Sequence, residues 1–291
     1  MIRVIGISSG KGGVGKTTVV ANLALALKNL GKRVLIIDCN LSTPHLSYYL
    51  GVNNYRSTLN DVMLDRAKLE SAIYNYEGIK FIPASLDMED LIGLDLRKFK
   101  RTVMQLSDPS SLDFILLDSA PGLGREAVCV LNAADEILFV SNPFVPMIND
   151  VMRCLSVIKQ IGRKKVGIVL NMVTGNGYEL LGKVVENVTK VPVVGTIAFD
   201  KNMYYSLVSG EPILEYNPCS HASVGFMELA ANLTGEVYSP PGKMERIAAL
   251  IKNKISDFRS AHSKIPQTKD FVERELILQE GQDKELKKTK G

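Results

Sequence analysis

The stretch Gly10-Lys11-Gly12-Gly13-Val14-Gly15-Lys16-Thr17-Thr18 decides the fold of this 291-residue chain. It follows a short apolar run at residues 2–8 and precedes a segment with helical spacing at residues 19–30. The pattern Gly-x-x-x-x-Gly-Lys-Thr between a strand and a helix is typical of a loop that wraps backbone N–H groups around a polyphosphate. The N-terminus of the helix adds the positive end of its dipole. The stretch therefore predicts a nucleotide-binding α/β domain.

Two side chains of this loop carry the expected phosphate and metal chemistry. Lys16 is expected to reach the β- and γ-phosphates, and the Thr17 hydroxyl is expected to bind Mg²⁺. The full set of predicted nucleotide contacts in the loop is Gly10, Lys11, Gly12, Gly13, Val14, Gly15, Lys16, Thr17 and Thr18. The sequence thus predicts a nucleoside polyphosphate with Mg²⁺ at this position.

Short apolar runs alternate with helical patterns along most of the chain. The predicted strands lie at residues 2–8, 34–38, 79–83, 114–118, 136–141, 165–171 and 193–196. Near-continuous apolar runs are typical of strands that are buried on both faces of a parallel sheet. We therefore predict an α/β fold with a doubly wound, mostly parallel sheet and helices on both faces. A helix at residues 220–234 is expected to close this domain before Gly235.

Polar residues end three of these runs. Asp38 ends the second run, Asp118 ends the Phe-Ile-Leu-Leu run that begins at residue 114, and Asn171 ends a later one. Because the carboxyl ends of parallel strands meet at one edge of a sheet, these side chains are expected to lie near the loop. A single carboxylate at the end of such a strand holds Mg²⁺ through water, so Asp118 is a predicted metal ligand together with Thr17.

The early lysine of the loop narrows the class of nucleotide-binding protein. The residues Lys11-Gly-Gly-Val-Gly-Lys16-Thr17-Thr18 resemble the deviant Walker A loop of the MinD/ParA family of ATPases, and the chain looks most like its archaeal MinD-like members. The resemblance covers about residues 1–235. It implies Mg-ATP binding, hydrolysis to ADP and phosphate, and a homodimer when ATP is bound. In that dimer the early lysine, here Lys11, crosses to the phosphates of the facing subunit, where a cation stabilises developing charge.

The stretch Asp38-Cys-Asn40 resembles the switch I segment of this family, with one departure. The resemblance implies that Asp38 supports the hydration of Mg²⁺. The family usually has a second aspartate, which positions or activates the attacking water, where this chain has Asn40. An amide orients water by hydrogen bonding but does not accept its proton. We therefore expect slow ATP hydrolysis, with Lys11, Lys16 and Asn40 as the catalytic residues.

The resemblance also implies two contacts to the nucleotide base. Asn171 corresponds to an asparagine that hydrogen-bonds the edge of adenine. The segment Ile197-Ala-Phe-Asp200 resembles the family's Pro-x-Asp segment and makes Asp200 the second predicted contact, although Ala198 replaces the family proline. Phe144 stands where MinD usually has Glu, so the partner of bacterial MinD is not carried over to this chain.

Composition narrows the partners and the compartment. The net charge is only +4 and no dense basic cluster lies in the core sequence, so nucleic acid is not expected as a partner. The cysteines are scattered without a C-x-x-C pair, which fits reduced thiols in the cytoplasm; they are Cys39, Cys129, Cys154 and Cys219. The sequence contains no secretory segment and no run of about 18 apolar residues, so no membrane-spanning helix is expected.

The chain is expected to divide into two parts. Residues 1–236 would form the ATPase domain and residues 237–291 a C-terminal appendage. Apolar residues at helical spacing with basic neighbours predict an amphipathic helix at about 244–259. In MinD such a helix binds membrane, so peripheral contact with the inner face of the cell membrane is one expectation, and packing onto the domain is the other. The charged tail at 260–291 is expected to be partly disordered.

Other functional classes stay open at this point. A ParA-like DNA or cargo partition ATPase would need a basic face, and a nucleotide-gated interaction module would follow if Asn40 nearly abolished turnover. An iron–sulfur carrier would need paired cysteines, and a small-molecule kinase would have no use for Lys11. The favoured interpretation is a MinD-like ATPase switch that controls the position of an unidentified regulatory protein or cargo.

Overall fold

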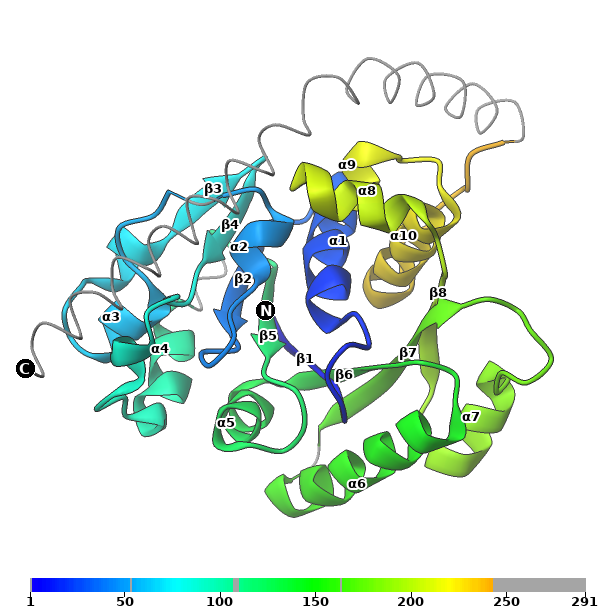
Figure 1. Cartoon of the computed structure of the whole chain (residues 1–291), viewed down its shortest axis with the longest axis horizontal. Helices are drawn as coiled ribbons and strands as arrows, with labels where there is room; N and C mark the ends of the chain where they lie inside the picture. Colours follow the sequence, from blue (N-terminus) through cyan, green and yellow to red (C-terminus); the bar gives the residue numbers. More distant parts are fainter. Residues whose placement is uncertain (1, 53, 107–109, 163, 243–291) are drawn as a thin grey trace, which may run out of the picture. The chain divides into compact units, whose positions relative to one another are not determined.

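The computed structural model describes residues 2–52, 54–106, 110–162 and 164–242 (Figure 1). Its sheet has eight strands in the order β3-β4-β2-β5-β1-β6-β7-β8. Neighbouring strands pair in parallel, except for β3 and β4, which are antiparallel. The strands are β1 (Arg3–Ser8), β2 (Val34–Cys39), β3 (Tyr74–Tyr76), β4 (Ile79–Ile82), β5 (Phe114–Ser119), β6 (Glu136–Ser141), β7 (Lys165–Val173) and β8 (Val193–Ala198).

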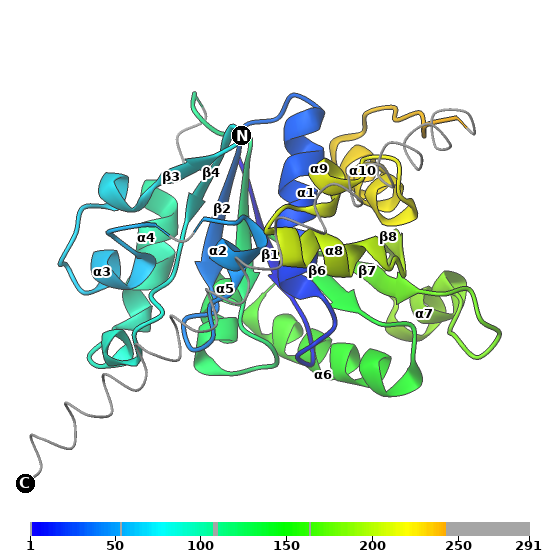
Figure 2. The same cartoon turned by 45° about the horizontal axis from the view of Figure 1, so that its top comes forward.

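Helices cover both faces of this sheet (Figures 1 and 2). One core cluster packs beneath α1 (Lys16–Asn29), α2 (Leu46–Tyr49), α8 (Asn202–Ser209), α9 (Ile213–Tyr216) and α10 (His221–Thr234). The opposite cluster packs beneath α3 (Leu59–Met63), α4 (Phe99–Gln105), α5 (Arg125–Ala133), α6 (Val145–Ile161) and α7 (Gly182–Thr189). Three short 3₁₀ turns, η1 (Leu69–Ala72), η2 (Met88–Leu91) and η3 (Leu96–Lys98), lie between β2 and α4 in the sequence.

The two-sided burial follows from the strand sequences. In β2, Val34 and Ile36 contribute to the core on the α1 side, whereas Leu35 and Ile37 contribute to the core on the α5 side. Successive side chains of a strand point to opposite faces, so a run in which every residue is apolar fills both cores. The central strands are therefore held on both sides, and the polar residues at their ends have fixed positions.

The predicted fold class is confirmed, and each predicted strand coincides with an observed one to within a few residues. Helix α1 begins at Lys16, three residues before the predicted start. Helix α10 matches its prediction, with the Ser220 hydroxyl accepting a hydrogen bond from the backbone N–H of Ser223 at 3.1 Å as an N-cap. Strand β3 was not predicted, because Tyr-Asn-Tyr is short and has no apolar run. The predicted helix at 244–259 and the tail at 260–291 lie outside the described residues.

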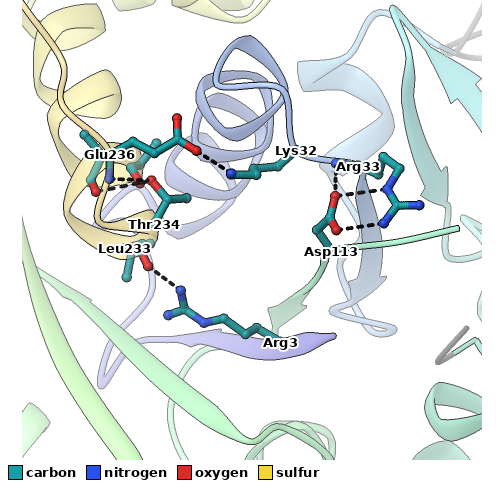
Figure 3. A network of polar contacts seen from close by, with 9 residues as sticks. Arg3, Lys32, Arg33, Asp113, Leu233, Thr234 and Glu236 are labelled. Carbon is teal, nitrogen blue, oxygen red and sulfur yellow. Dashed lines mark hydrogen bonds and ion pairs between the residues drawn. The ribbon is translucent and has the colours of Figure 1, made fainter. Parts of the chain in front are cut away.

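Polar contacts fasten the start of β1 to the end of α10 (Figure 3). The Arg3 guanidinium donates to the carbonyl of Leu233 and forms an ion pair with Glu136 of β6. Lys32, after α1, pairs with Glu236, after α10, and the neighbouring Arg33 pairs with Asp113 at the start of β5. These contacts hold α1 and α10 relative to the sheet on the side remote from the strand ends that carry the predicted site.

Candidate functional site

The loop between β1 and α1 has the backbone geometry of an anion cradle. Gly13 and Gly15 adopt φ values of +81° and +85°, which L side chains rarely adopt. Gly15 caps the N-terminus of the 14-residue helix α1, and the first turn of that helix contains no acidic residue. Its unpaired backbone N–H groups and positive dipole end therefore remain available to an anion. Lys11, in the first half of this loop, is exposed.

Close neighbours fix the two ends of this loop. A Cβ atom at Gly10 would lie 2.5 Å from Cβ of Asp150 in α6, and a Cβ atom at Gly15 would lie 2.3 Å from Nδ2 of Asn171 in β7. Both distances are well below van der Waals contact; glycine is required by space at Gly10, which also meets the Asp150 backbone, and is favoured at Gly15 by its φ of +85° as well. The loop thus packs directly against α6 and β7.

Lys16 and Asp118 form a buried ion pair at the base of the loop. The Lys16 Nζ lies 2.7 Å from the Asp118 Oδ1, and the two residues are 7% and 0% exposed. Asp118 lies directly opposite Asp38 in the register of β5 and β2. The second carboxylate oxygen of Asp118, Oδ2, is buried without a hydrogen-bond partner. A buried acceptor without a partner is costly, so this oxygen is a place where a ligand would be stabilising.

Asp38 is held by the backbone that follows it. Its Oδ1 accepts from the N–H of Asn40 and its Oδ2 from the N–H of Leu46, both at 3.1 Å. Burial and the neighbouring charge of Asp118 raise the pKa of Asp38 to about 7, although the two backbone N–H groups and Lys16 act in the opposite direction. Two buried carboxylates therefore share one lysine.

This donor set fits a bound Mg²⁺ ion. The unpartnered Oδ2 of Asp118 and the surplus negative charge beside Asp38 suit a divalent cation, and carboxylate and hydroxyl oxygens are the ligands that Mg²⁺ prefers. Thr17 follows Lys16 in the first turn of α1 and would supply the hydroxyl. Thr17, Asp38 and Asp118 thus remain the predicted metal residues.

Asn40 has a different environment from the one expected of a water-positioning residue. Its amide nitrogen donates to the carbonyl of Thr43, and its amide oxygen accepts from the Thr43 hydroxyl at 3.2 Å. These two hydrogen bonds join Asn40 to Thr43 within the loop that follows β2, and Asn40 is largely buried. To orient a water molecule, Asn40 would first have to exchange at least one of these bonds.

A bulge in β7 directs Asn171 toward the phosphate loop. The pairing of β7 with β8 shifts register between Leu170 and Val173, and Met172 adopts a φ of +58°. Bulges of this kind reorient a side chain, and positive φ values at non-glycine residues concentrate at functional sites. The Asn171 Nδ2 donates to the carbonyl of Val14 at 2.8 Å. The predicted base contact is therefore also a brace for the loop.

A cavity of about 210 Å³ lies next to this asparagine. Its walls include Asn171, Asp200, Phe199 and residues of α1, α2 and α8. Asp200 lines the cavity, but its Oδ1 accepts from the backbone and side-chain nitrogens of Asn202 at 2.9 and 2.8 Å, and its Oδ2 accepts from Ala222 N at 3.4 Å. Asp200 therefore also fixes the starts of α8 and α10.

Sequence reasoning missed three residues of the site. Asn22 of α1 lines the cavity and accepts a hydrogen bond from the N–H of Leu214 at 3.3 Å; its signal was a polar residue on the buried face of a helix. Tyr49 of α2 lines the same cavity. Glu126 of α5 accepts hydrogen bonds from the hydroxyl and the N–H of Ser42, which joins the loop after β2 to the helix after β5. No spacing in the sequence indicates the last two contacts.

Two structural features of the described residues bear on membrane and metal binding. No described helix combines the length and the apolar character needed to cross a bilayer. In the same part of the chain, no three or more His, Cys, Asp or Glu side chains gather in a metal-binding group, and Cys39, Cys129, Cys154 and Cys219 are free thiols.

Comparison with known proteins identifies the family of this chain. A model of the ParA family, described as the NUBPL iron-transfer P-loop NTPase, matches residues 1–234. The chain belongs to this family. An uncharacterized ATP-binding protein of Methanocaldococcus jannaschii is 32% identical over 253 residues, which cover 87% of this chain and 95% of that protein.

Two solved structures extend the relationship to MinD. The septum site-determining protein MinD of Pyrococcus horikoshii, complexed with Mg-ADP, is 35% identical with a TM-score of 0.76, and the match covers 80% of this chain and 96% of that one. MinD in the MinC:MinD cell division complex of Aquifex aeolicus is 29% identical with a TM-score of 0.73 over 82% and 99% of the two chains. The chain is thus a ParA-family P-loop ATPase of the MinD type. The cofactors of this group are ATP or ADP with Mg²⁺, as predicted.

Proposed function

We propose that this ParA-family protein is an ATP-dependent switch that dimerises face to face when it holds Mg-ATP and returns to the monomer after slow hydrolysis. The observation that carries the proposal is the position of Lys11. It lies in the phosphate loop, is exposed, and forms no ion pair with another residue in the described ranges. An exposed and unpaired cation in a phosphate-binding loop is suited to contact the phosphates of a second subunit.

The residues of the site would share the work as follows. The loop N–H groups and the N-terminus of α1 bind the phosphates, and Lys16 leaves Asp118 to contact them. Thr17 and Asp118 would hold Mg²⁺, with Asp38 supporting its hydration; the ion would neutralise phosphate charge. Asn171 and Asp200 would contact the base from the walls of the cavity.

Slow turnover is proposed because Asn40 is poorly suited to activate water. It has no carboxylate to accept a proton, and its amide is occupied by Thr43. The same observation supports a second candidate function, a nucleotide-gated interaction module with little turnover. In that case ATP binding alone would control the partner, and hydrolysis would contribute little to resetting the switch.

The output of the switch is proposed to be the positioning of a regulatory protein or cargo in the cytoplasm. Support comes from the MinC:MinD complex, in which a relative of this chain binds a protein partner. Phe144 and Val145, at the start of α6, are exposed apolar residues on the helix against which the phosphate loop packs, and they offer a surface for such a partner. Peripheral membrane contact through the segment at 244–259 is proposed as a second anchor, and nucleic acid is not proposed as a partner.

The experiment measures nucleotide turnover and particle size together. The full chain is incubated with Mg-ADP, Mg-ATP or Mg-GTP and analysed by size-exclusion chromatography, with phosphate release recorded in parallel. The proposal predicts slow release of phosphate from ATP and a larger particle with Mg-ATP only. Dimerisation with ATP but without phosphate release would favour the nucleotide-gated module. A particle size that is the same with every nucleotide would contradict both proposals. Adding anionic liposomes then tests membrane contact.

A further inference from the structure

Two walls of the cavity beside Asn171 come from distant parts of the sequence. One is the short helix α2, which contributes Tyr49, and the other is α8, which contributes Met203, Tyr204 and Leu207. Both helices lie next to each other in the two views of Figures 1 and 2. The Tyr49 side chain is partly buried and packs against the α1-side core.

The other end of α2 is attached to Asp38. The backbone N–H of Leu46, the first residue of α2, donates to the Asp38 Oδ2 at 3.1 Å. The Leu46 and Leu50 side chains are buried in the core. About one turn of helix therefore separates the residue that donates to Asp38 from Tyr49, whose ring lines the cavity.

The two cavity walls also touch each other directly. Gly51, just after α2, and Gly210, just after α8, have φ values of +61° and +64°. A Cβ atom at Gly51 would lie 2.6 Å from the carbonyl oxygen of Gly210, and one at Gly210 would lie 3.0 Å from Cα of Gly51. This close contact between the two backbones leaves no room for a side chain at Gly51 or Gly210. It therefore connects the end of α2 directly to the end of α8.

We propose that Tyr49 contacts the nucleotide base and that α2 links recognition of the base to the position of Asp38. This inference rests on the proposed function, since it requires a nucleotide in the site. A base entering between Tyr49 and α8 would fix α2, and the Leu46–Asp38 hydrogen bond would pass that constraint to the carboxylate that supports Mg²⁺ hydration. Tyr49 acts as a base-contacting residue, whereas Gly51 and Gly210 act as positioning residues.

The first experiment separates base contact from general stability. Binding of Mg-ADP and of Mg-tripolyphosphate, which has no base, is measured by calorimetry for wild type, Tyr49→Phe and Tyr49→Leu. Because stacking of a base on an aromatic ring is strong, Tyr49→Leu should weaken Mg-ADP binding about tenfold and leave tripolyphosphate unchanged. Tyr49→Phe should bind both ligands within about twofold of wild type. Tyr48→Leu, one residue away and not on the cavity, is the matched control and should resemble wild type.

The second experiment tests the link to Asp38. Gly51→Ala inserts a Cβ against Gly210, whereas the control Gly31→Ala adds a Cβ at a similar φ of +75° where no atom lies within 4 Å. Both variants carry the strain of a positive φ, and melting curves show whether both fold. Gly51→Ala should raise the KM for ATP and also the Mg²⁺ concentration for half-maximal turnover, each severalfold relative to Gly31→Ala.

The outcomes distinguish this inference from the proposed function. If wild type binds neither Mg-ADP nor Mg-tripolyphosphate, both fail. If wild type binds both and Tyr49→Leu weakens both equally, or neither, base contact by Tyr49 is wrong while nucleotide binding stands. If Gly51→Ala raises the KM for ATP without changing the Mg²⁺ dependence, the coupling through α2 is wrong.

Discussion

Lys16 Nζ donates a 2.7 Å hydrogen bond to Asp118 Oδ1, so the lysine expected on the phosphates is paired with the carboxylate expected on the metal. Both side chains are buried, and Asp38 lies directly opposite Asp118 on the neighbouring strand. The positive charge of Lys16 reduces the electrostatic repulsion between the two adjacent buried carboxylates of Asp38 and Asp118. Phosphates and a divalent cation would replace this pairing with stronger ones, so we expect Lys16 to exchange partners when a nucleotide binds.

Removal of Lys16 should therefore affect stability as well as activity. In buffer with EDTA, Lys16→Met should lower the free energy of unfolding by about 3–5 kcal/mol, because it leaves a buried charge unpaired. The double variant Lys16→Met with Asp118→Asn should recover much of this loss, the single variant Asp118→Asn completes the cycle, and none of the three variants should turn over ATP. Urea unfolding of the four proteins checks the cycle. Equal stability of wild type and Lys16→Met would show that the pair is not stabilising Asp118.

Lys11 should matter for turnover and not for folding. Because its side chain is exposed, Lys11→Ala should melt within about 1 °C of wild type. If it reaches the phosphates of a second subunit, its loss should lower kcat by on the order of a hundredfold or more, by analogy with a cation supplied in trans. Phosphate release under saturating Mg-ATP measures the effect. Lys183→Ala, an exposed lysine of α7, is the control; if the two variants have the same kcat, Lys11 is only a loop residue.

The rate of hydrolysis should respond to Asn40. Asn40→Asp supplies a carboxylate and removes the amide donor to Thr43, so kcat should rise by about a hundredfold, near the low end of general-base effects. Thr43→Val serves as the control, since it frees the Asn40 oxygen without adding an acid. An unchanged kcat in Asn40→Asp would contradict the explanation of slow turnover, and a rise in Thr43→Val alone would assign it to loop release instead.

The contact between Ser42 and Glu126 should hold the loop after β2 in place. Ser42→Ala removes only the hydroxyl hydrogen bond to Glu126 and keeps the one from the backbone N–H, so it should cost only about 1 kcal/mol of global stability. Hydrogen exchange of residues 40–46 should nevertheless become severalfold faster without nucleotide. Ser156→Ala, which removes an exposed hydrogen bond within α6, should leave these residues unchanged. Unaltered exchange in Ser42→Ala would mean that the contact does not restrain the loop.

Acid should weaken the pair between Arg33 and Asp113. Hydrogen bonds from the Arg33 side chain and backbone lower the pKa of Asp113 from its ordinary value of 3.8 to about 2. A lowered folded-state pKa stabilises the fold above pH 4 and loses its effect as pH falls toward 2. Because the pair is solvent-exposed, Asp113→Asn should cost less than about 1 kcal/mol at pH 7 and nothing near pH 2. Urea unfolding at both pH values tests this; an equal cost at both would contradict the ion-pair assignment.

The elements that the sequence predicts well are those decided by local pattern. The apolar runs of β1, β2 and β5 specify buried parallel strands, and the glycines with Lys16 and Thr17 specify the loop. The closeness of Asp38 and Asp118 could be predicted because the carboxyl ends of parallel strands meet at one edge of a sheet. The pairing of Asn40 with Thr43 and the contact of Tyr49 with the cavity could not be predicted in this way. They depend on loop closure and on packing between α2 and α8, which no spacing encodes.

The bulge at Met172 illustrates the same limit. The sequence placed Asn171 at the end of a strand, but its direction comes from a register shift against β8 that is decided by pairing between distant segments. The resulting bond from Asn171 to Val14 makes the predicted base contact a structural brace as well. Local chemistry therefore identified the residue, and tertiary pairing determined what it touches.

The central claim is that Mg-ATP brings two copies together through Lys11, and molar mass by light scattering tests it most directly. Wild type and Lys11→Ala are measured with Mg-ADP and with Mg²⁺ and a slowly hydrolysed ATP analogue, after equal nucleotide binding has been verified. The account predicts a monomer in every sample except wild type with the analogue, which should have twice the monomer mass. A monomer in that sample, or a dimer of Lys11→Ala, would contradict it.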